Sequence, residues 1–411
     1  MAYSSTSPGR RFPFALGLAI FLVQTAIGAI LFSIFQQYVP VKLGAGDAWG
    51  GYLLAAYGAA RFVSETPAGA FTDRVERKLV ILVGFALMVP AVAVMSVWQS
   101  NAMFLGCAAF LGFGTAFIWP ATYAIAADLY AMDERGKVIG FLNLCQLLGF
   151  GVGGLAGALL IESAPTAIFV VAIAGIVLAF IVTLLRIPSY RTASLFAHVE
   201  RGARRRLRDV LSRDMAYVCV IFFGSSITLS GVIPLIRPYG ETEVGVSFAR
   251  LTLALLPAVV VACALYVPAG HLADRAGRTL PLVIGQAMIA FGLVAASMTD
   301  SLVLVATFAG FIFVGNVLTV PALNAAMMDL APESHRGAVI GMTVALTGLG
   351  LAAGPALGGL VLTTSTPAIG FRLAAVCAIC LAAATAARRS AFRPRAPMIL
   401  DVTARGSAAT P

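Results

Sequence analysis

The sequence predicts an all-α integral membrane protein with twelve transmembrane helices, arranged as two parallel six-helix repeats. Three observations predict this class: the composition, the number of long apolar segments and an internal repeat. Of the 411 residues, 60% are hydrophobic and only 11% are charged, and the mean hydropathy is +0.94. Soluble globular chains carry about 25% charged residues. This chain has too little charge to cover a soluble surface, so a bilayer is its expected solvent.

Long apolar segments occur along the whole chain. A helix needs about 20 apolar residues to cross a bilayer. Twelve segments meet this requirement: 12–37, 48–70, 79–98, 102–127, 138–162, 165–187, 215–237, 247–270, 280–299, 302–328, 337–364 and 367–387. The first has no small-residue cleavage site at the expected distance, so we interpret it as a retained helix and not a signal peptide.

One long polar connection divides these segments into six and six. Residues 188–214 are rich in arginine and include Arg204, Arg205, Arg206 and Arg208. We expect an N-terminal half at 1–187, a cytoplasmic linker at 188–214 and a C-terminal half at 215–387. Residues 388–411 form a basic tail that we expect to be disordered and cytoplasmic.

The basic residues predict the orientation. If both termini lie on one side, that side holds 23 of the 28 lysines and arginines. Basic residues concentrate on the cytoplasmic side of membrane proteins. We therefore expect a multi-pass protein of the cytoplasmic (inner) membrane with both termini in the cytoplasm. The net charge of +10 then lies near anionic lipid headgroups, and no nucleic-acid partner is expected.

The two halves repeat each other when residue n is aligned with residue n + 201. Charged residues, prolines and glycines match without gaps at several separate places. The matched pairs are Pro67/Pro268, Gly69/Gly270, Asp73/Asp274, Arg74/Arg275, Arg77/Arg278, Pro120/Pro321, Asp128/Asp329, Arg135/Arg336, Gly136/Gly337, Gly149/Gly350, Gly153/Gly354 and Gly157/Gly358. Because six spans separate the copies, the halves share one orientation about an axis along the membrane normal.

Two loops carry a recognisable motif. The loop after the second helix reads G-A-F-T-D-R-V-E-R-K, and the loop after the eighth reads G-H-L-A-D-R-A-G-R-T. Both resemble the G-x-x-x-D-R-x-G-R-[RK] signature of the major facilitator superfamily. They depart from it at Glu76 and Thr279. The resemblance covers roughly residues 12–387 and implies a secondary active transporter that moves a small organic solute by alternating access.

The resemblance also implies a cytoplasmic gate. Asp73 is expected to cap the eleventh helix and Asp274 the fifth, while Arg77 reaches Asp128 and Arg278 reaches Asp329. We expect these contacts only while the cytoplasmic ends of the halves are together. Alternatively, the loop charges only set the topology. The expected gate residues are Gly69, Asp73, Arg74, Arg77, Asp128, Arg135, Gly270, Asp274, Arg275, Arg278, Asp329 and Arg336.

Three of the charged residues inside the predicted spans are candidates for a functional role. Arg61 and Glu65 are one turn apart and can pair. Charges in membrane spans are costly and usually functional. Glu65 can therefore be a gate residue, a proton site or an interfacial residue. Arg237 lies between two prolines near the outer mouth, where it can extend to lipid headgroups or attract an anionic substrate. We treat all three as candidate coupling residues.

The central cavity is expected to be neutral and polar. The fourth predicted span carries no charge, and the first offers only glutamines. Several of the expected lining residues are matched pairs of the repeat. The lining residues are Gln24, Thr115, Trp119, Tyr123, Ser225, Asn316 and Asn324. Each can instead make a hydrogen bond between helices.

The glycine motifs bear on the transport class. The eleventh span contains G-P-x-x-G-G, starting at Gly354, which is similar to the fifth-helix motif of drug antiporters. The motif favours export of amphipathic compounds, although here the fifth span lacks the proline. Drug antiporters of the superfamily commonly carry an arginine in the fourth helix, and this chain has none there. That absence, with Arg61 and Arg237, favours an importer or exchanger of a small metabolite, and the two arginines would suit an anionic one. A non-transporting sensor is disfavoured because both gate loops are retained.

No catalytic constellation is evident. The three histidines lie in predicted loops or the linker, the six cysteines lie in apolar stretches, and no phosphate-binding loop is present. The sequence does not predict an enzyme, a metal site or a cofactor. The expected partners are a small-molecule substrate, the lipid bilayer and, as a candidate coupling ion, the proton. We expect a monomer.

Overall fold

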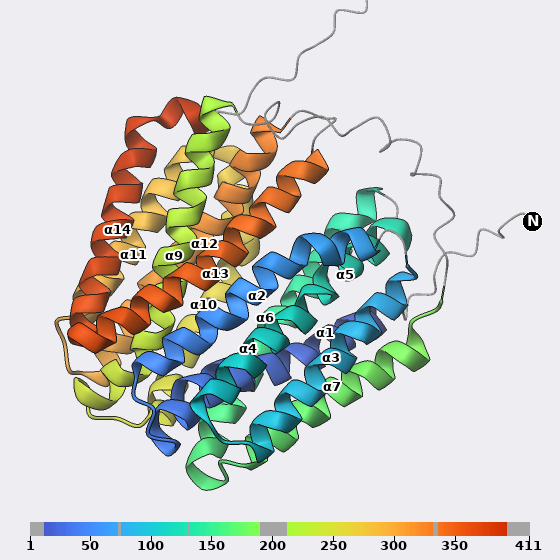
Figure 1. Cartoon of the computed structure of the whole chain (residues 1–411). Coiled ribbons are helices and arrows are strands. Elements are labelled where there is room, and N and C mark those ends of the chain that lie inside the picture. Colours follow the sequence, from blue (N-terminus) through green and yellow to red (C-terminus); the bar gives the residue numbers. More distant parts are fainter. Residues whose placement is uncertain (1–11, 73–74, 130–131, 190–211, 332–335, 393–411) are drawn as a thin grey trace, which may run out of the picture.

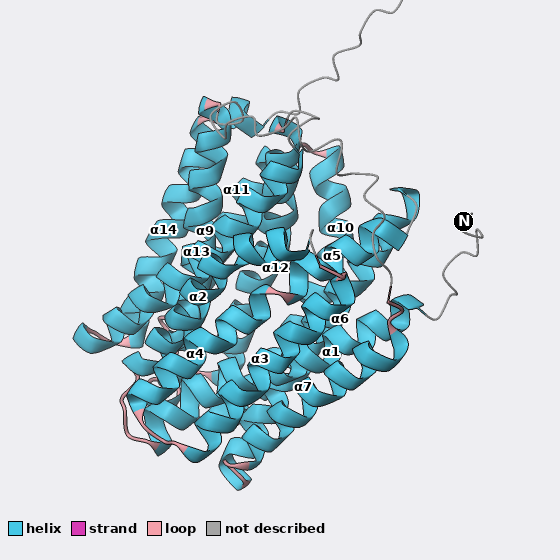
Figure 2. Ribbon diagram, turned by 45° about the vertical axis from the view of Figure 1, so that its right-hand side comes forward, coloured by secondary structure: helices cyan, strands magenta, loops and turns pink. Residues whose placement is uncertain are grey.

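The computed structural model describes residues 12–72, 75–129, 132–189, 212–331 and 336–392. Within these ranges the chain consists of helices and connecting loops, with no strand (Figure 2). Helices satisfy every backbone polar group inside one segment, which a bilayer requires of a spanning chain. The predicted all-α class is therefore confirmed.

The described helices form two groups that lie side by side (Figure 1). The N-terminal group comprises α1 (Phe12–Ala29), η1 (Ile30–Lys42), α2 (Ala48–Thr72), α3 (Arg77–Val97), α4 (Asn101–Ala116), α5 (Ile118–Leu129), α6 (Met132–Ser163) and α7 (Ala167–Arg186). The C-terminal group comprises α9 (Arg213–Thr242), α10 (Phe248–Arg275), α11 (Thr279–Ala296), α12 (Leu302–Leu330), α13 (Arg336–Thr364), α14 (Pro367–Ala387) and η4 (Arg389–Phe392).

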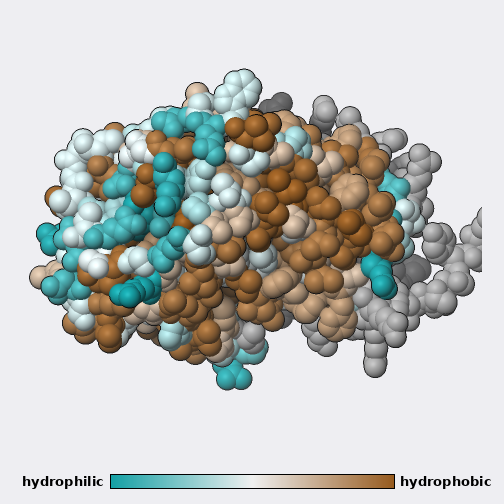
Figure 3. Space-filling view, turned by 90° about the horizontal axis from the view of Figure 1, so that it is seen from below, coloured by the Kyte–Doolittle hydropathy of each residue, from teal (hydrophilic) through white to brown (hydrophobic). Residues whose placement is uncertain are grey.

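Eleven of the spans in the described part of the chain are long and apolar enough to cross a membrane. The second predicted span, α2, has 25 residues but is not among them. It carries Arg61 and Glu65, which lower its hydropathy. Viewed from below Figure 1, hydrophobic side chains cover much of the surface, and hydrophilic ones gather toward one side (Figure 3).

Two predicted spans are less regular than expected. The first continues from α1 into the π-helix η1, whose Gln36 amide donates to the Gly50 carbonyl at 3.2 Å and so ties η1 to α2. The fourth, predicted as one helix over 102–127, is divided at Phe117 into α4 and α5. Pro120 lies in the first turn of α5, where the helix does not need its missing amide hydrogen.

The halves meet where α2 lies along α13. A Cβ built at Gly51 would collide with the Pro355 carbonyl oxygen, and one at Gly58 would lie 2.6 Å from the Leu351 backbone. On the facing helix, a Cβ at Gly348 would lie 3.3 Å from the Phe62 side chain. Because glycine has no side chain, the two helices approach until their backbones touch.

The glycine motifs of the fifth and eleventh spans act in packing within each half. A Cβ at Gly153 of α6 would collide with the Thr25 carbonyl of α1, and one at Gly354 of α13 would collide with Ser230 of α9. These contacts support the interpretation of the motifs as helix-packing surfaces.

The end of the chain corrects one expectation. We expected residues 388–411 to be disordered, but Arg389–Phe392 form η4. Ala391 and Phe392 of η4 are buried, and the Phe392 ring lies 6.3 Å from the Tyr217 ring. This apolar contact orders the start of the tail, so the expectation was wrong there. Residues 393–411 lie outside the described residues.

The α2–α4 contact gives a test of the packing. Gly112→Ala should destabilise the fold by about 1–3 kcal/mol, because the new methyl would collide with the Tyr57 carbonyl of α2. Gly106→Ala on the same helix is the matched control, since a Cβ there meets nothing within 4 Å. Thermal unfolding in detergent measures both variants. Equal melting temperatures for the two would contradict the packing.

Candidate functional site

Each half carries an ion pair at the end of the bundle where α3 and α11 begin, which we call the Arg77 end. Arg77 Nε donates to Asp128 Oδ2 at 2.6 Å, and Arg278 Nε donates to Asp329 Oδ2 at 2.9 Å. The two pairs have the same spacing of 51 residues and occupy matched positions of the repeat. Both predicted pairings are present in the structure.

The predicted dependence of these pairs on closure is wrong. Arg77 and Asp128 both belong to the N-terminal half, and Arg278 and Asp329 both belong to the C-terminal half. Each pair therefore joins helices of one half and does not need the other half beside it.

The remaining gate predictions are only partly described. Asp73 and Arg74, with the predicted cap on the eleventh helix, lie outside the described residues. The side chains of Asp274, Arg135 and Arg336 are likewise not described, although their backbones are. Arg275 is exposed at the last turn of α10.

The opposite end of the bundle, which we call the Asp47 end, holds an ion pair between the halves. Arg237 of α9 is only 2% exposed. Its two terminal nitrogens donate to Asp47, which precedes α2, and to Glu241, one turn further along α9. A buried guanidinium held by two carboxylates neither extends to headgroups nor has charge free for an anionic substrate. The structure therefore fits neither of the two roles expected for Arg237, contact with lipid headgroups or attraction of an anionic substrate.

A polar cluster lies between the two ends of the bundle. Arg61 of α2 donates to Glu65 at 3.4 Å, as predicted. The other Glu65 oxygen, Oε2, is buried without a hydrogen-bond partner among the described residues. Tyr123 of α5 lies near both residues and near Tyr266 of α10, so the cluster includes both halves. Sequence reasoning missed Tyr266, although it is the repeat mate of Glu65.

Aromatic and amide groups extend this cluster. The Tyr123 hydroxyl donates to Asn143 Oδ1 of α6 at 3.3 Å. The rings of Trp119 and Tyr123 are 5.2 Å apart and inclined by 35°. Asn324, the repeat mate of Tyr123, is half-buried on α12. The structure thus combines apolar ring faces with hydrogen-bonding tips, a chemistry suited to amphipathic molecules.

Other predicted cavity residues lie in helix packing. Thr115 is 2% exposed and donates to the Gly112 carbonyl of its own helix. Ser225 is buried and accepts from Gln286 of α11 at 2.6 Å. Gln24 is buried on α1, where its Cβ lies next to Gly149 of α6. These three residues therefore take part in helix packing and hydrogen bonding, and not in lining an open cavity.

Asn316 differs from its repeat mate Thr115. Its side chain is half-buried on α12, and its Oδ1 atom is buried without a hydrogen-bond partner among the described residues. A buried acceptor without a partner costs about 1–3 kcal/mol. Such an atom is relieved when a donor, such as a substrate group or water, binds to it.

The fold and this cluster define a helical membrane transporter of two six-helix halves. The family model of the Major Facilitator Superfamily matches residues 16–355 and 242–403. The chain belongs to this superfamily and is a secondary active transporter.

Curated relatives share most of the chain. It is 26% identical over 355 residues to Multidrug resistance protein 2 of Bacillus subtilis (strain 168), which covers 83% of this chain and 86% of the relative. It is 24% identical over 361 residues to Multidrug resistance protein MdtH of Sodalis glossinidius (strain morsitans), which covers 86% of both chains.

A solved structure supports the fold. A bacterial homolog of the human lysosomal transporter Spinster, in an inward-facing and occupied conformation, superposes with a TM-score of 0.75. The match covers 94% of this chain and 98% of the other at 16% identity. The two-repeat arrangement predicted from the sequence is thereby confirmed.

The Asp47–Arg237 pair gives a test of how the halves are joined. Asp47→Asn should open the Asp47 end more often, because it weakens a contact between halves. Asp47 is partly exposed, so the loss is about 1 kcal/mol, or about a fivefold change in population. Hydrogen–deuterium exchange should then be faster in peptides at residues 44–50 and 238–247.

Glu241→Gln is the matched control for this test. Glu241 binds the same arginine but belongs to the same half, so its loss leaves the connection between halves in place. Equal exchange rates in Asp47→Asn and Glu241→Gln would contradict the assigned role of Asp47.

Proposed function

We propose that this protein exports amphipathic organic compounds from the cytoplasm. The observation that carries the proposal is the polar and aromatic cluster of Glu65, Arg61, Tyr123 and Tyr266 between the halves, in which the buried Trp119 ring supports Tyr123. Ring faces can hold the apolar part of a compound, and the carboxylate and amide groups can hold its polar part. Two relatives along most of the chain are named multidrug resistance proteins, which supports this substrate class.

Glu65 is the proposed coupling residue. Its Oε2 atom is buried without a partner, and its other oxygen is held by Arg61 only at 3.4 Å. A carboxylate in such surroundings is stabilised by taking up a proton or a cationic group. If Glu65 binds a proton in one conformation and the compound in the other, inward movement of protons is coupled to outward movement of the compound. Of the three sequence interpretations of Glu65, this geometry favours the proton site.

The orientation supports export from the cytoplasm. The distribution of basic residues places the Arg77 end in the cytoplasm. The Asp47 end, where Arg237 joins the halves, then faces outside. In this orientation the Asp47–Arg237 pair joins the halves at the outer end, and we propose that the cytoplasmic end is open. This is the state in which a cytoplasmic compound would enter.

The geometry does not favour an importer of anionic metabolites. Arg61 is paired with Glu65, and Arg237 is held by Asp47 and Glu241. Both arginines that suggested an anion site are thus already paired with carboxylates. We propose a monomer in the cytoplasmic membrane, because each half contributes to the cluster within a single chain.

The proposal predicts dye export. Cells without their main drug exporters should accumulate less ethidium when they produce this protein, and a protonophore should abolish the difference. Accumulation of a panel of cationic, neutral and anionic amphipathic dyes should identify the class. If proteoliposomes containing the purified protein moved none of these compounds under a proton gradient, the export proposal would be wrong.

Glu65 is tested by neutralisation. Glu65→Gln should reduce proton-driven dye transport at least tenfold, because the side chain can no longer exchange a proton, while binding measured without a gradient is retained. Glu162→Gln, at an exposed position near the end of α6, is the matched control. Transport by Glu65→Gln at the rate of this control would exclude Glu65 as the coupling residue.

A further inference from the structure

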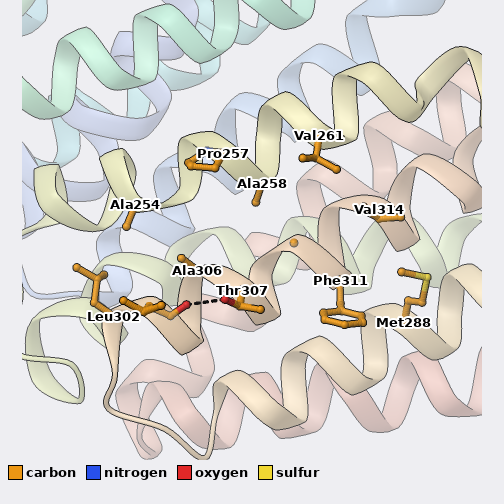
Figure 4. A pocket seen from close by; sticks show the side chains of 12 residues that line it. Ala254, Pro257, Ala258, Val261, Met288, Leu302, Ala306, Thr307, Phe311 and Val314 are labelled. Carbon is orange, nitrogen blue, oxygen red and sulfur yellow. Dashed lines mark hydrogen bonds between the residues drawn. The ribbon is translucent and has the colours of Figure 1, made fainter.

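An apolar groove of about 610 Å³ lies on the C-terminal half between α10 and α12, with Met288 of α11 beside it. Its walls are one face of α10 and the first half of α12 (Figure 4). The lining residues are Ala254, Pro257, Ala258, Val261, Met288, Leu302, Val303, Ala306, Thr307, Gly310, Phe311 and Val314. Its volume is within the range of small-ligand sites.

The groove is exposed, and no residue of the polar cluster lines it. Val303 is 73% exposed and Val261 is 50% exposed, although both are apolar residues of predicted spans. Thr307 is the polar residue of the lining, and its hydroxyl donates to the Val303 carbonyl at 2.8 Å (Figure 4). With that hydroxyl satisfied, the lining offers its occupant only apolar contacts.

The N-terminal half fills the corresponding space. Leu53 and Tyr57, the repeat mates of Ala254 and Ala258, are fully buried against α4. Gly112 lets the backbones of α2 and α4 touch. The matched position on α12 is not a glycine but Phe313. Phe313 packs against the cluster of Ala262, Ala269 and Val317, so a phenylalanine ring lies where the other half has a backbone contact. The small side chains of Ala254 and Ala258 on α10 leave space, and the ring of Phe313 keeps α12 away from α10. The groove therefore forms in the C-terminal half and not at the matched place in the N-terminal half.

The groove has the length of one lipid chain. From Leu302 to Val314, α12 rises about 18 Å at 1.5 Å per residue. Half of a bilayer's hydrocarbon core is about 15 Å thick. The groove begins at the first turns of α10 and α12, so it spans the leaflet at the Asp47 end.

A free positive charge lies at the start of the groove. Arg250, in the first turn of α10, is four residues before Ala254 and so shares its helix face. It is exposed, and no carboxylate of the described residues forms an ion pair with it. The acidic residue just before α12, Asp300, forms no ion pair with Arg250.

We propose that the groove is a binding site for an anionic phospholipid of the leaflet at the Asp47 end. One acyl chain lies along α12 between Ala258 and Phe311, and the phosphate pairs with Arg250. The apolar lining selects hydrocarbon, and the unpaired guanidinium selects a negative headgroup. The site is separate from the proposed export site, because no residue of the polar cluster lines the groove.

Native mass spectrometry of the detergent-solubilised protein tests this proposal. The probes are phosphatidylglycerol and phosphatidylcholine with identical acyl chains. Phosphatidylglycerol should bind about fivefold more tightly, and Arg250→Gln should remove that preference. Lys42→Gln is the matched control, since Lys42 is an exposed cation at the same end in the other half.

The apolar part of the site is tested by filling the groove as the N-terminal half does. Ala258→Tyr should weaken binding of both lipids at least fivefold, whereas Ala174→Leu, at an exposed position on α7, should leave binding unchanged. Melting temperatures check that each variant is folded. Unchanged lipid binding in both Arg250→Gln and Ala258→Tyr would overturn the proposal. So would loss of dye binding in Ala258→Tyr with lipid binding retained, since the groove would then admit substrate.

Discussion

The two halves of this transporter are joined where glycines of α2 bring its backbone against that of α13. Gly51 and Gly58 of α2 lie against the backbone of α13, and Gly348 of α13 lies against Phe62. In a bilayer, apolar side chains gain little by leaving lipid, so close packing must hold helices together. A contact of this kind requires few side-chain rearrangements when the helices tilt. It is therefore suited to remain in place while the ends of the halves separate and approach.

The ion pairs at the two ends act differently because of how they are connected. Arg77–Asp128 and Arg278–Asp329 each join helices of one half, so they stiffen that half whatever its position. Asp47–Arg237 joins the two halves, and it forms only while the Asp47 end is closed. Because Asp47 is partly exposed, water can replace it at modest cost. A weak contact of this kind allows two conformations to differ by only a few kcal/mol.

Much of the fold could be predicted because the repeat places charged residues in register. Asp128 and Asp329 follow their arginines by the same interval, so the pairing that the family resemblance implies for one half applies to the other as well. The pairing of Arg237 with Asp47 could not be predicted, because Asp47 comes from the other half and no pattern within one half encodes that contact. The groove was also missed. Alanines at 254 and 258 resemble ordinary packing residues until Tyr57 is seen to fill the matching space.

The central claim is that the halves tilt about the α2–α13 contact, so that one end opens as the other closes. Spin labels in a cysteine-free background test it directly by double electron–electron resonance. One pair reports on the Asp47 end, at Lys42 and Glu243, and the other on the Arg77 end, at Phe71 and Leu272; all four positions are exposed. On addition of a transported compound, the distance of one pair should lengthen while that of the other shortens. Distances that both stay unchanged, or that change in the same direction, would contradict the account.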